Sequence, residues 1–169
     1  MNRVNSINKR GAGKEHPRSS LIQISAAIIF FLIWILDSFI FMISTILTQY
    51  TPFIIQLILF LSLLIIGLVL ISVTGHILFH GEDPSKLIKT GIFSHTRHPL
   101  YLGVLLTYLG LVFLSLSLLS IIGLIIVFVL YNWIATFEEN DLQEIFKKEY
   151  LEYKKKVSKW IPSIKKRKT

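Results

Sequence analysis

A long uncharged stretch in the second half of the chain decides its fold: "PLYLGVLLTYLGLVFLSLSLLSIIGLIIVFVLYNWIATF", residues 99–137. It holds 39 residues without an Asp, Glu, Lys or Arg, and a helix needs about 20 apolar residues to cross a hydrocarbon core of ~30 Å. The serines of "SLSLLS", residues 115–120, divide the stretch near its middle. We therefore predict two membrane-spanning helices, 99–117 and 119–137, joined by a tight turn.

Two further apolar blocks precede this hairpin, at 21–47 and 53–79, and Asp37 is the only charged residue from Ser19 to His80. Each block is long enough to span a membrane. The first is also longer than the roughly 7–15 apolar residues of a secretory signal peptide. The sequence predicts an all-α polytopic membrane protein with four transmembrane helices in a single domain, 21–169, after a flexible basic arm, 1–20.

Composition excludes several kinds of site. The 169 residues are 53% hydrophobic, carry a formal net charge of +8 and include no Cys, so disulfides, thiolate nucleophiles and Cys-ligated metals are absent. His76 and His80 are spaced i and i+4, but a third ligand is not apparent, and no metal site is predicted. Asp37 is either a functional acid inside the membrane or a group bonded by neighbouring hydroxyls such as those of Ser38 or Ser44.

The basic residues predict the orientation. Five Lys and Arg lie in residues 1–20, three in the 80–98 loop and ten after Phe137. Four spans place these three segments on one face, which the positive-inside tendency makes cytoplasmic, with both termini there. Because the basic tail adjoins membrane spans, we expect it to contact anionic lipid headgroups rather than nucleic acid.

The segment after Phe137, "EENDLQEIFKKEYLEYKKKVSKWIP" (138–162), places apolar side chains at helical spacing, with acidic residues early and lysines late. That order matches the helix dipole. The pattern predicts an amphipathic helix, about 138–158, lying in the membrane interface. Trp160 is expected to close the chain back against the membrane.

Polar residues gather at both ends of the 99–137 hairpin. Pro99 suits a first helical turn, where unpaired backbone N–H groups attract an anion. Three side chains that can assist lie beside it: Arg97, His98 and Tyr101. Glu138 and Glu139 leave the membrane on the same face and can hold a cation. A ligand with both a carboxylate and a cationic centre fits between them, although each cluster alone also fits a headgroup contact or a helix cap.

These two clusters resemble the motifs of a known family. "KLIKTGIFSHTRHPLYLG" (86–103) is similar to its Leu-Val, Gly, then Arg-His-Pro-x-Tyr pattern, and residues 138–162 to its Glu-Glu, Glu-Tyr-x-x-Tyr, Val and Ile-Pro pattern. The family is that of membrane methyltransferases typified by isoprenylcysteine carboxyl methyltransferase, with phospholipid methyltransferases as relatives. The resemblance covers about residues 60–162, with both motifs in order around a hydrophobic hairpin.

The resemblance implies transfer of a methyl group from S-adenosylmethionine, a cofactor that carries a carboxylate, an ammonium and a sulfonium. It implies that Glu138 holds the charged methionyl part and that the backbone around Lys86, Leu87 and Ile88 lines the adenosine end. The remaining cofactor-binding positions that it implies are Gly91, where a close turn is needed, Phe93, Arg97, His98, Pro99, Leu100 and Tyr101.

The chain departs from the family pattern at four positions. The family often has His at Ser85, Tyr at Phe93 and Gly at Lys147. Its carboxyl-methylating members have an Arg at Ile134, where it can meet the substrate carboxylate. An isoprenylcysteine carboxylate is therefore not favoured as the acceptor here, and carboxylates, amines and thiols remain open.

The sequence thus predicts an S-adenosylmethionine-dependent methyltransferase that acts at the cytoplasmic face on a lipidic or small membrane-partitioning acceptor. A carboxylate or thiolate acceptor needs no general base, whereas an amine could use Glu139 or His95. The alternative is a non-enzymatic membrane scaffold or lipid-binding protein. A transporter fits less well, since no inverted repeat is visible.

Overall fold

The computed structural model describes residues 18–80 and 86–161. Most of the predicted basic arm, the family position Ser85 and the tail beyond Ile161 lie outside the described residues, as does the side chain of His80. What is described includes all four predicted spans and both motif clusters except Pro162.

The described residues form helices and no strand. In chain order the elements are α1 (Ser19–Ile35), η2 (Leu36–Phe41), η3 (Ile46–Tyr50), α2 (Phe53–His80), η4 (Gly91–Ser94), α3 (Pro99–Ser115) and α4 (Leu118–Lys156). Three stretches, Ser19–Phe41, Phe53–Leu78 and Leu118–Lys156, are long and apolar enough to cross a membrane, and α3 is a shorter apolar helix. The predicted all-α, polytopic membrane fold is confirmed.

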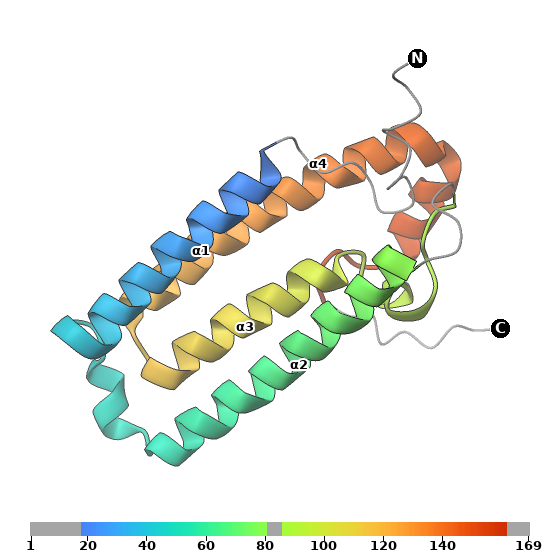
Figure 1. Cartoon of the computed structure of the whole chain (residues 1–169). Coiled ribbons are helices and arrows are strands. Elements are labelled where there is room, and N and C mark those ends of the chain that lie inside the picture. The colour runs from blue at the N-terminus through green and yellow to red at the C-terminus, as the bar shows by residue number, and fades with distance from the viewer. Residues whose placement is uncertain (1–17, 81–85, 162–169) are drawn as a thin grey trace.

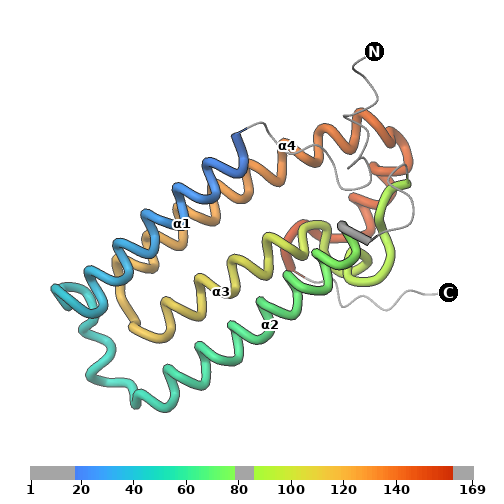
Figure 2. The backbone as a smooth tube through the Cα atoms, in the orientation of Figure 1, coloured from blue at the N-terminus to red at the C-terminus, as the bar shows by residue number. Residues whose placement is uncertain are grey.

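The helices are arranged as two pairs, with α3 alongside α2 and α1 alongside α4 (Figures 1 and 2). The α2 and α3 backbones approach closely because glycines face each other: a Cβ added at Gly67 would lie 2.6 Å from the carbonyl oxygen of Gly103. Small residues permit such contacts between membrane helices, where packing rather than water exclusion drives association.

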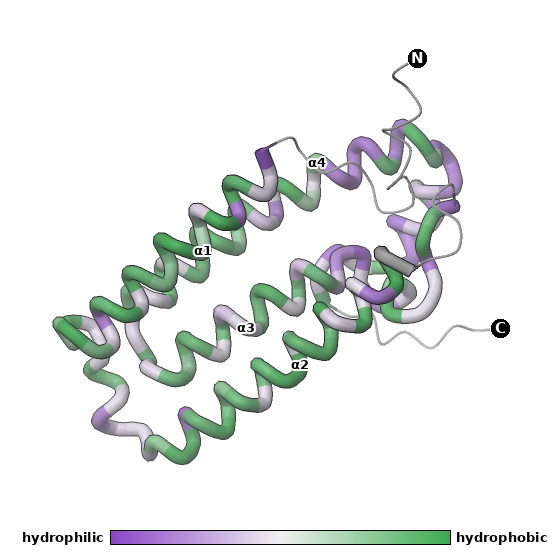
Figure 3. The backbone as a smooth tube through the Cα atoms, in the orientation of Figure 1, coloured by the Kyte–Doolittle hydropathy of each residue, from purple (hydrophilic) through white to green (hydrophobic). Residues whose placement is uncertain are grey.

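Aromatic side chains join the two pairs. The Phe30 ring of α1 meets Tyr108 of α3 edge to face, with 4.6 Å between ring centroids. Both rings are buried in one cluster with Val127 and Tyr131 of α4. The outward faces of α1, α2 and α4 remain apolar and exposed, as lipid contact requires (Figure 3).

The first span ends earlier than the predicted 47. After α1 the chain becomes π-helical, and Met42 takes a left-handed conformation with φ 50°. The cause is the buried Asp37 carboxylate, which accepts hydrogen bonds from the hydroxyls of Ser44 and Ser117 and from the Ser44 backbone N–H at 3.1 Å. The hydroxyl oxygens of Ser44 and Ser117 in turn accept hydrogen bonds from the backbone N–H groups of Leu119 and Ser120, respectively, at the start of α4. Asp37 therefore ties α1 to the α3–α4 turn.

The last helix differs from its prediction. No break occurs between 137 and 138: α4 runs through the polar residues and departs from helical geometry only at Lys147, with φ 44° and ψ −115°. The prediction that a separate interfacial helix starts at residue 138 was therefore wrong. The change from apolar to charged side chains marks the end of the apolar segment, but it leaves the i to i−4 backbone hydrogen bonds intact. Figure 3 shows the polar part of α4 at the same end of the molecule as the start of α3.

Candidate active site

The site begins with the loop that leads into α3. Thr96 is paired with Ser158 in an isolated parallel bridge, and the Arg97 backbone N–H donates to the Ser158 carbonyl oxygen at 3.0 Å. His98 follows as the residue that caps α3, and its carbonyl oxygen accepts the first helical bond, from Leu102 N–H at 3.0 Å. Pro99 occupies the first turn, where its missing N–H costs nothing.

Two carboxylates of α4 meet this loop. His98 Nδ1 lies 3.6 Å from Glu138 Oε2, and His98 Nε2 lies 3.2 Å from Glu139 Oε1. The Tyr101 hydroxyl donates to Glu138 Oε1. Glu138 and Glu139 are only 6% and 3% exposed. The expected meeting of the two motif clusters is thus present, and both carboxylates are enclosed by protein.

Glu139 is the centre of an ion-pair network. Its carboxylate lies 3.4 Å from Arg97 Nη2 and 3.1 Å from Lys154 Nζ, in addition to His98. Burial opposes its ionisation, but the hydrogen bond from His98 and the charge of Arg97 outweigh burial and lower the pKa of Glu139 to about 2. Glu139 is therefore ionised at neutral pH and is a weak proton acceptor.

His98, unlike Glu139, is uncharged. Burial lowers the pKa of His98 more than the neighbouring Glu139 raises it. A neutral ring that donates from Nε2 to Glu139 has an acceptor lone pair on Nδ1. Nδ1 and Glu138 Oε2 then present two acceptors 3.6 Å apart, an arrangement that favours a donor cation placed beside both.

Arg97 offers the opposite polarity. Its side chain is about nine-tenths buried, with 10% exposed. Its Nε and Nη1 atoms are buried and form no well-aligned hydrogen bond within the described part of the chain, and the buried Tyr150 hydroxyl interacts with the guanidinium. Buried donors without well-aligned partners are costly, and an oxyanion would satisfy both. The cluster therefore combines acceptors suited to a cation with donors suited to a carboxylate.

Comparison with known proteins identifies the family of this chain. Residues 50–149, more than half of the chain, match the family model for phospholipid methyltransferase. The chain belongs to the phospholipid methyltransferase family. The expected family resemblance is confirmed, and the matched region contains both α3 and the Glu138–Glu139 pair.

Individual relatives are also methyltransferases by name. The chain is 42% identical over 86 residues to protein-S-isoprenylcysteine O-methyltransferase of Saccharomyces cerevisiae, covering 49% of this chain and 35% of the relative. It is 33% identical over 94 residues to a probable protein-S-isoprenylcysteine O-methyltransferase of Oryza sativa subsp. indica, covering 55% and 49%. It is 26% identical over 91 residues to methanethiol S-methyltransferase 1 of Bradyrhizobium diazoefficiens, covering 54% and 31%. The chain spans less than half the length of each relative.

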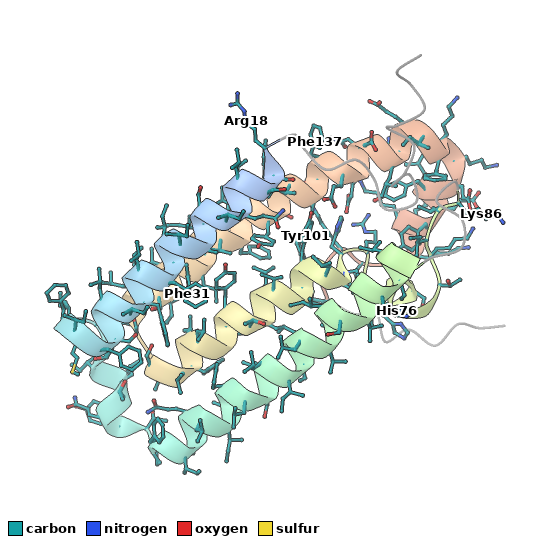
Figure 4. The ribbon with its side chains drawn as sticks, viewed as in Figure 1. Arg18, Phe31, His76, Lys86, Tyr101 and Phe137 are labelled. Atoms are coloured by element: carbon teal, nitrogen blue, oxygen red, sulfur yellow. The ribbon has the colours of Figure 1, made fainter. Side chains whose placement is uncertain are left out.

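The other cofactor-binding positions that the family resemblance implies surround the carboxylate–histidine cluster without contributing to the ion pairs described above. Leu100 packs partly buried against the membrane core. Leu87 is buried against Tyr150, Tyr153 and Val157 in a separate cluster, with Ile88 half-buried beside it in the chain. Lys86 is exposed at the outer edge of this end, well away from Tyr101 (Figure 4).

The 91–95 turn supports the loop without joining the carboxylates. Gly91 has a φ of 60°, which a residue with a side chain rarely adopts. Phe93 is buried, and its carbonyl oxygen accepts the Tyr153 hydroxyl at 2.6 Å. The structure places the candidate base His95 outside the cluster: it is exposed and pairs with Ser94 Oγ at 3.0 Å.

Sequence reasoning missed the C-terminal contributors to this phospholipid methyltransferase-family site. Lys154 reaches Glu139, and Trp160 packs against His98 with 5.9 Å between ring centroids. Trp160 also donates to Asn132 Oδ1 at 3.2 Å rather than serving only as a membrane anchor. The signal that could have found them is the family's Gly at Lys147, since a glycine inside a helical pattern suggests that the chain turns there.

Proposed function

We propose that this chain is an S-adenosylmethionine-dependent methyltransferase acting at the cytoplasmic face of a membrane. The observation that carries the proposal is the pairing of opposite polarities in one buried cluster. Arg97 offers two buried N–H donors, and Glu138 with His98 Nδ1 offers acceptors. These are the groups that a carboxylate and an ammonium or sulfonium require.

The residues present fit the cofactor. Arg97 would hold the methionyl carboxylate by charge-assisted hydrogen bonds. Glu138, oriented by the Tyr101 hydroxyl, would hold the cationic part, and its burial strengthens that attraction. The backbone around Leu87 would line the adenosine end, as the family resemblance implies.

When bound, S-adenosylmethionine supplies an activated methyl group on sulfur. The residues of the chain then need to align it with an acceptor and to exclude water. Glu139 is poorly suited to accept a proton because its pKa is about 2. We assign it to holding Arg97 and His98 in place. An acceptor that is already anionic, or an amine that arrives neutral, requires no base from this cluster.

The acceptor is proposed to be a lipidic or small membrane-partitioning molecule, since the cluster lies where α3 and α4 leave their apolar segments. Ile134 is fully buried, with 0% exposure, one turn before Glu138. It supplies no cation for a carboxylate, which disfavours an isoprenylcysteine acceptor. Similarity to relatives named for isoprenylcysteine and for methanethiol is consistent with more than one acceptor class in this family.

The test is cofactor binding by purified variants. Glu138→Gln and His98→Ala should each weaken S-adenosylmethionine binding about 10- to 100-fold in isothermal titration, since a hydrogen bond to a charged group contributes roughly 1.5–3 kcal/mol. Glu144→Gln is the matched control, because Glu144 is an exposed carboxylate on the same helix. Unchanged affinity in both site variants would remove the assignment.

The competing scaffold function is separated by the same titration. A lipid-binding scaffold would show no interaction with S-adenosylmethionine at any concentration, and its Arg97 would instead contact headgroups. To find the acceptor, the protein would be incubated with methyl-labelled cofactor and a lipid extract of its host. The species that acquires label identifies the acceptor class.

A further inference from the structure

We propose that the segment beyond the kink, residues 148–161, is a hinged cover over the carboxylate–histidine cluster, turning about Lys147. This segment is called the cover below. It opens to admit a polar ligand from water and closes over it. The proposal rests on the proposed function only for the identity of that ligand, and its test includes a measurement that needs no ligand.

The first observation is that the cluster is closed. Glu138, Glu139 and His98 are all buried. A water-soluble, charged ligand cannot pair with Glu138 while protein occupies its surroundings. Some element that encloses the cluster must therefore move for binding to occur.

The second observation is how the cover is held. Lys154 reaches Glu139 at 3.1 Å, Ser158 accepts the Arg97 N–H at 3.0 Å, and Thr96 Oγ1 donates to the Lys159 carbonyl oxygen at 2.9 Å. These are polar contacts that water can replace on opening. They attach the cover directly to the loop and the carboxylate that form the cluster.

Most apolar contacts of the cover are separate from the core between the transmembrane helices. Tyr150, Tyr153 and Val157 pack with Leu87 and Leu142 in a small cluster of their own. The large cluster inside the helices contains none of these residues. Trp160 is the one residue of the cover that packs against the large cluster, and Trp160 and Lys159 also bond to Asn132 of α4. Opening therefore requires these contacts to break, but it leaves the packing of the transmembrane helices against one another in place.

The third observation is strain at the junction. Lys147 has φ 44° and ψ −115°, a conformation that favours glycine and disfavours residues with a Cβ. Such strain persists only where surrounding contacts impose it. The contacts that impose it here are those of the closed cover, so opening would relieve the strain. A few residues that absorb a backbone change in this way form a hinge.

The ligand-independent test is hydrogen exchange of the detergent-solubilised protein, followed by mass spectrometry. Peptides covering 94–98 and 148–161 should exchange at least tenfold faster than α3, and faster still in Lys154→Met, which removes the contact with Glu139. Lys155→Met, which removes the same charge from a neighbouring exposed residue, should behave as wild type. Exchange in the cover as slow as in α3, in both the wild type and Lys154→Met, would overturn the proposal.

The second test locks the cover. The chain has no cysteine, so Thr96→Cys combined with Ser158→Cys introduces a single possible disulfide between bridge partners. Oxidation should slow S-adenosylmethionine association at least tenfold, and reduction should restore it, while each single variant is unaffected by oxidant. Equal association rates in the oxidised and reduced double variant would refute the cover. Absence of binding in the reduced variant and the wild type alike would instead refute the proposed cofactor, and hydrogen exchange would still decide on the cover.

Discussion

At the scale of single residues, the two adjacent glutamates have different environments and so different uses. Glu139 is surrounded by Arg97, His98 and Lys154, and its charge is balanced within the protein. Glu138 meets a tyrosine hydroxyl and a neutral imidazole. Because Glu139 already balances three basic side chains, we assign the cation of the proposed ligand to Glu138. The different roles assigned to Glu138, which binds the ligand, and Glu139, which holds Arg97 and His98, follow from these contacts.

The paired state of Glu139 predicts a pH dependence of stability. Its pKa falls from 4.5 to about 2 on folding, so its stabilisation is complete above about pH 4.5 and is lost as the pH falls toward 2. The shift corresponds to about 3 kcal/mol. Since burial also lowers the pKa of His98, protonation of His98 below about pH 6.5 destabilises in the same direction.

Glu139→Gln should therefore be less stable at neutral pH and should show a flatter stability profile between about pH 4.5 and 2. The measurement is thermal unfolding in detergent, followed by tryptophan fluorescence at several pH values. Glu144→Gln provides an exposed carboxylate control. Parallel profiles for wild type and Glu139→Gln would contradict the assignment of Glu139 as the centre of the network.

Much of the site could be predicted from residue types and their spacing. Arg97, His98 and Glu138 were identified because charged groups at the two ends of one apolar hairpin must lie at the same membrane face. Lys154 could not be found in this way. Its contact with Glu139 depends on a change of chain direction at Lys147, and a lysine at that position gives no local signal for a left-handed backbone.

At the scale of elements, the α2–α3 pair is the most closely packed part of the fold. A Cβ at Gly67 would meet the Gly103 carbonyl oxygen at 2.6 Å, and a Cβ at Gly103 would meet that of Gly67 at 2.7 Å. These are backbone atoms, so neither side can yield without moving a helix. Because α3 carries His98 and Tyr101 at its start, this packing also positions the cluster.

Gly67→Ala should destabilise the protein by about 1–3 kcal/mol, the usual range for overpacking. Gly75→Ala on the same helix is the matched control, since a Cβ there meets nothing within 4 Å. That control should be neutral or more stable by about 0.5–1 kcal/mol, because alanine favours helix. Equal midpoints of thermal unfolding for the two variants would show that the close approach of α2 and α3 is unimportant.

The ends of helices could be predicted where a local residue restricts the backbone or caps the helix, and not where they depend on a contact between residues distant in sequence. Pro99 begins α3 as expected because it has no N–H to lose. The turn after Ser115 was expected from its serines, and Ser117 does cap α4 by accepting the Ser120 N–H at 3.0 Å. The early end of α1 was not, because it depends on the contact between Asp37 and Ser117, which are distant in sequence.

At the scale of the whole molecule, charge and topology agree. The start of α1, the end of α2, the start of α3 and the polar part of α4 gather at one end, and the α1–α2 and α3–α4 connections lie at the other (Figure 1). Every Lys and Arg among the described residues belongs to the first end. By the positive-inside tendency, we propose that this basic end faces the cytoplasm.

The same asymmetry predicts which residues a membrane-impermeant reagent can reach. Because the chain lacks cysteine, single substitutions report without background. Tyr50→Cys, at an exposed position in η3 between α1 and α2, should react with an impermeant maleimide in intact cells or right-side-out vesicles. Lys155→Cys, beyond the kink at the site end, should react only after permeabilisation. The reverse pattern would place the cluster outside the cytoplasm, where S-adenosylmethionine is not made, and would leave the proposed methyl transfer without its donor.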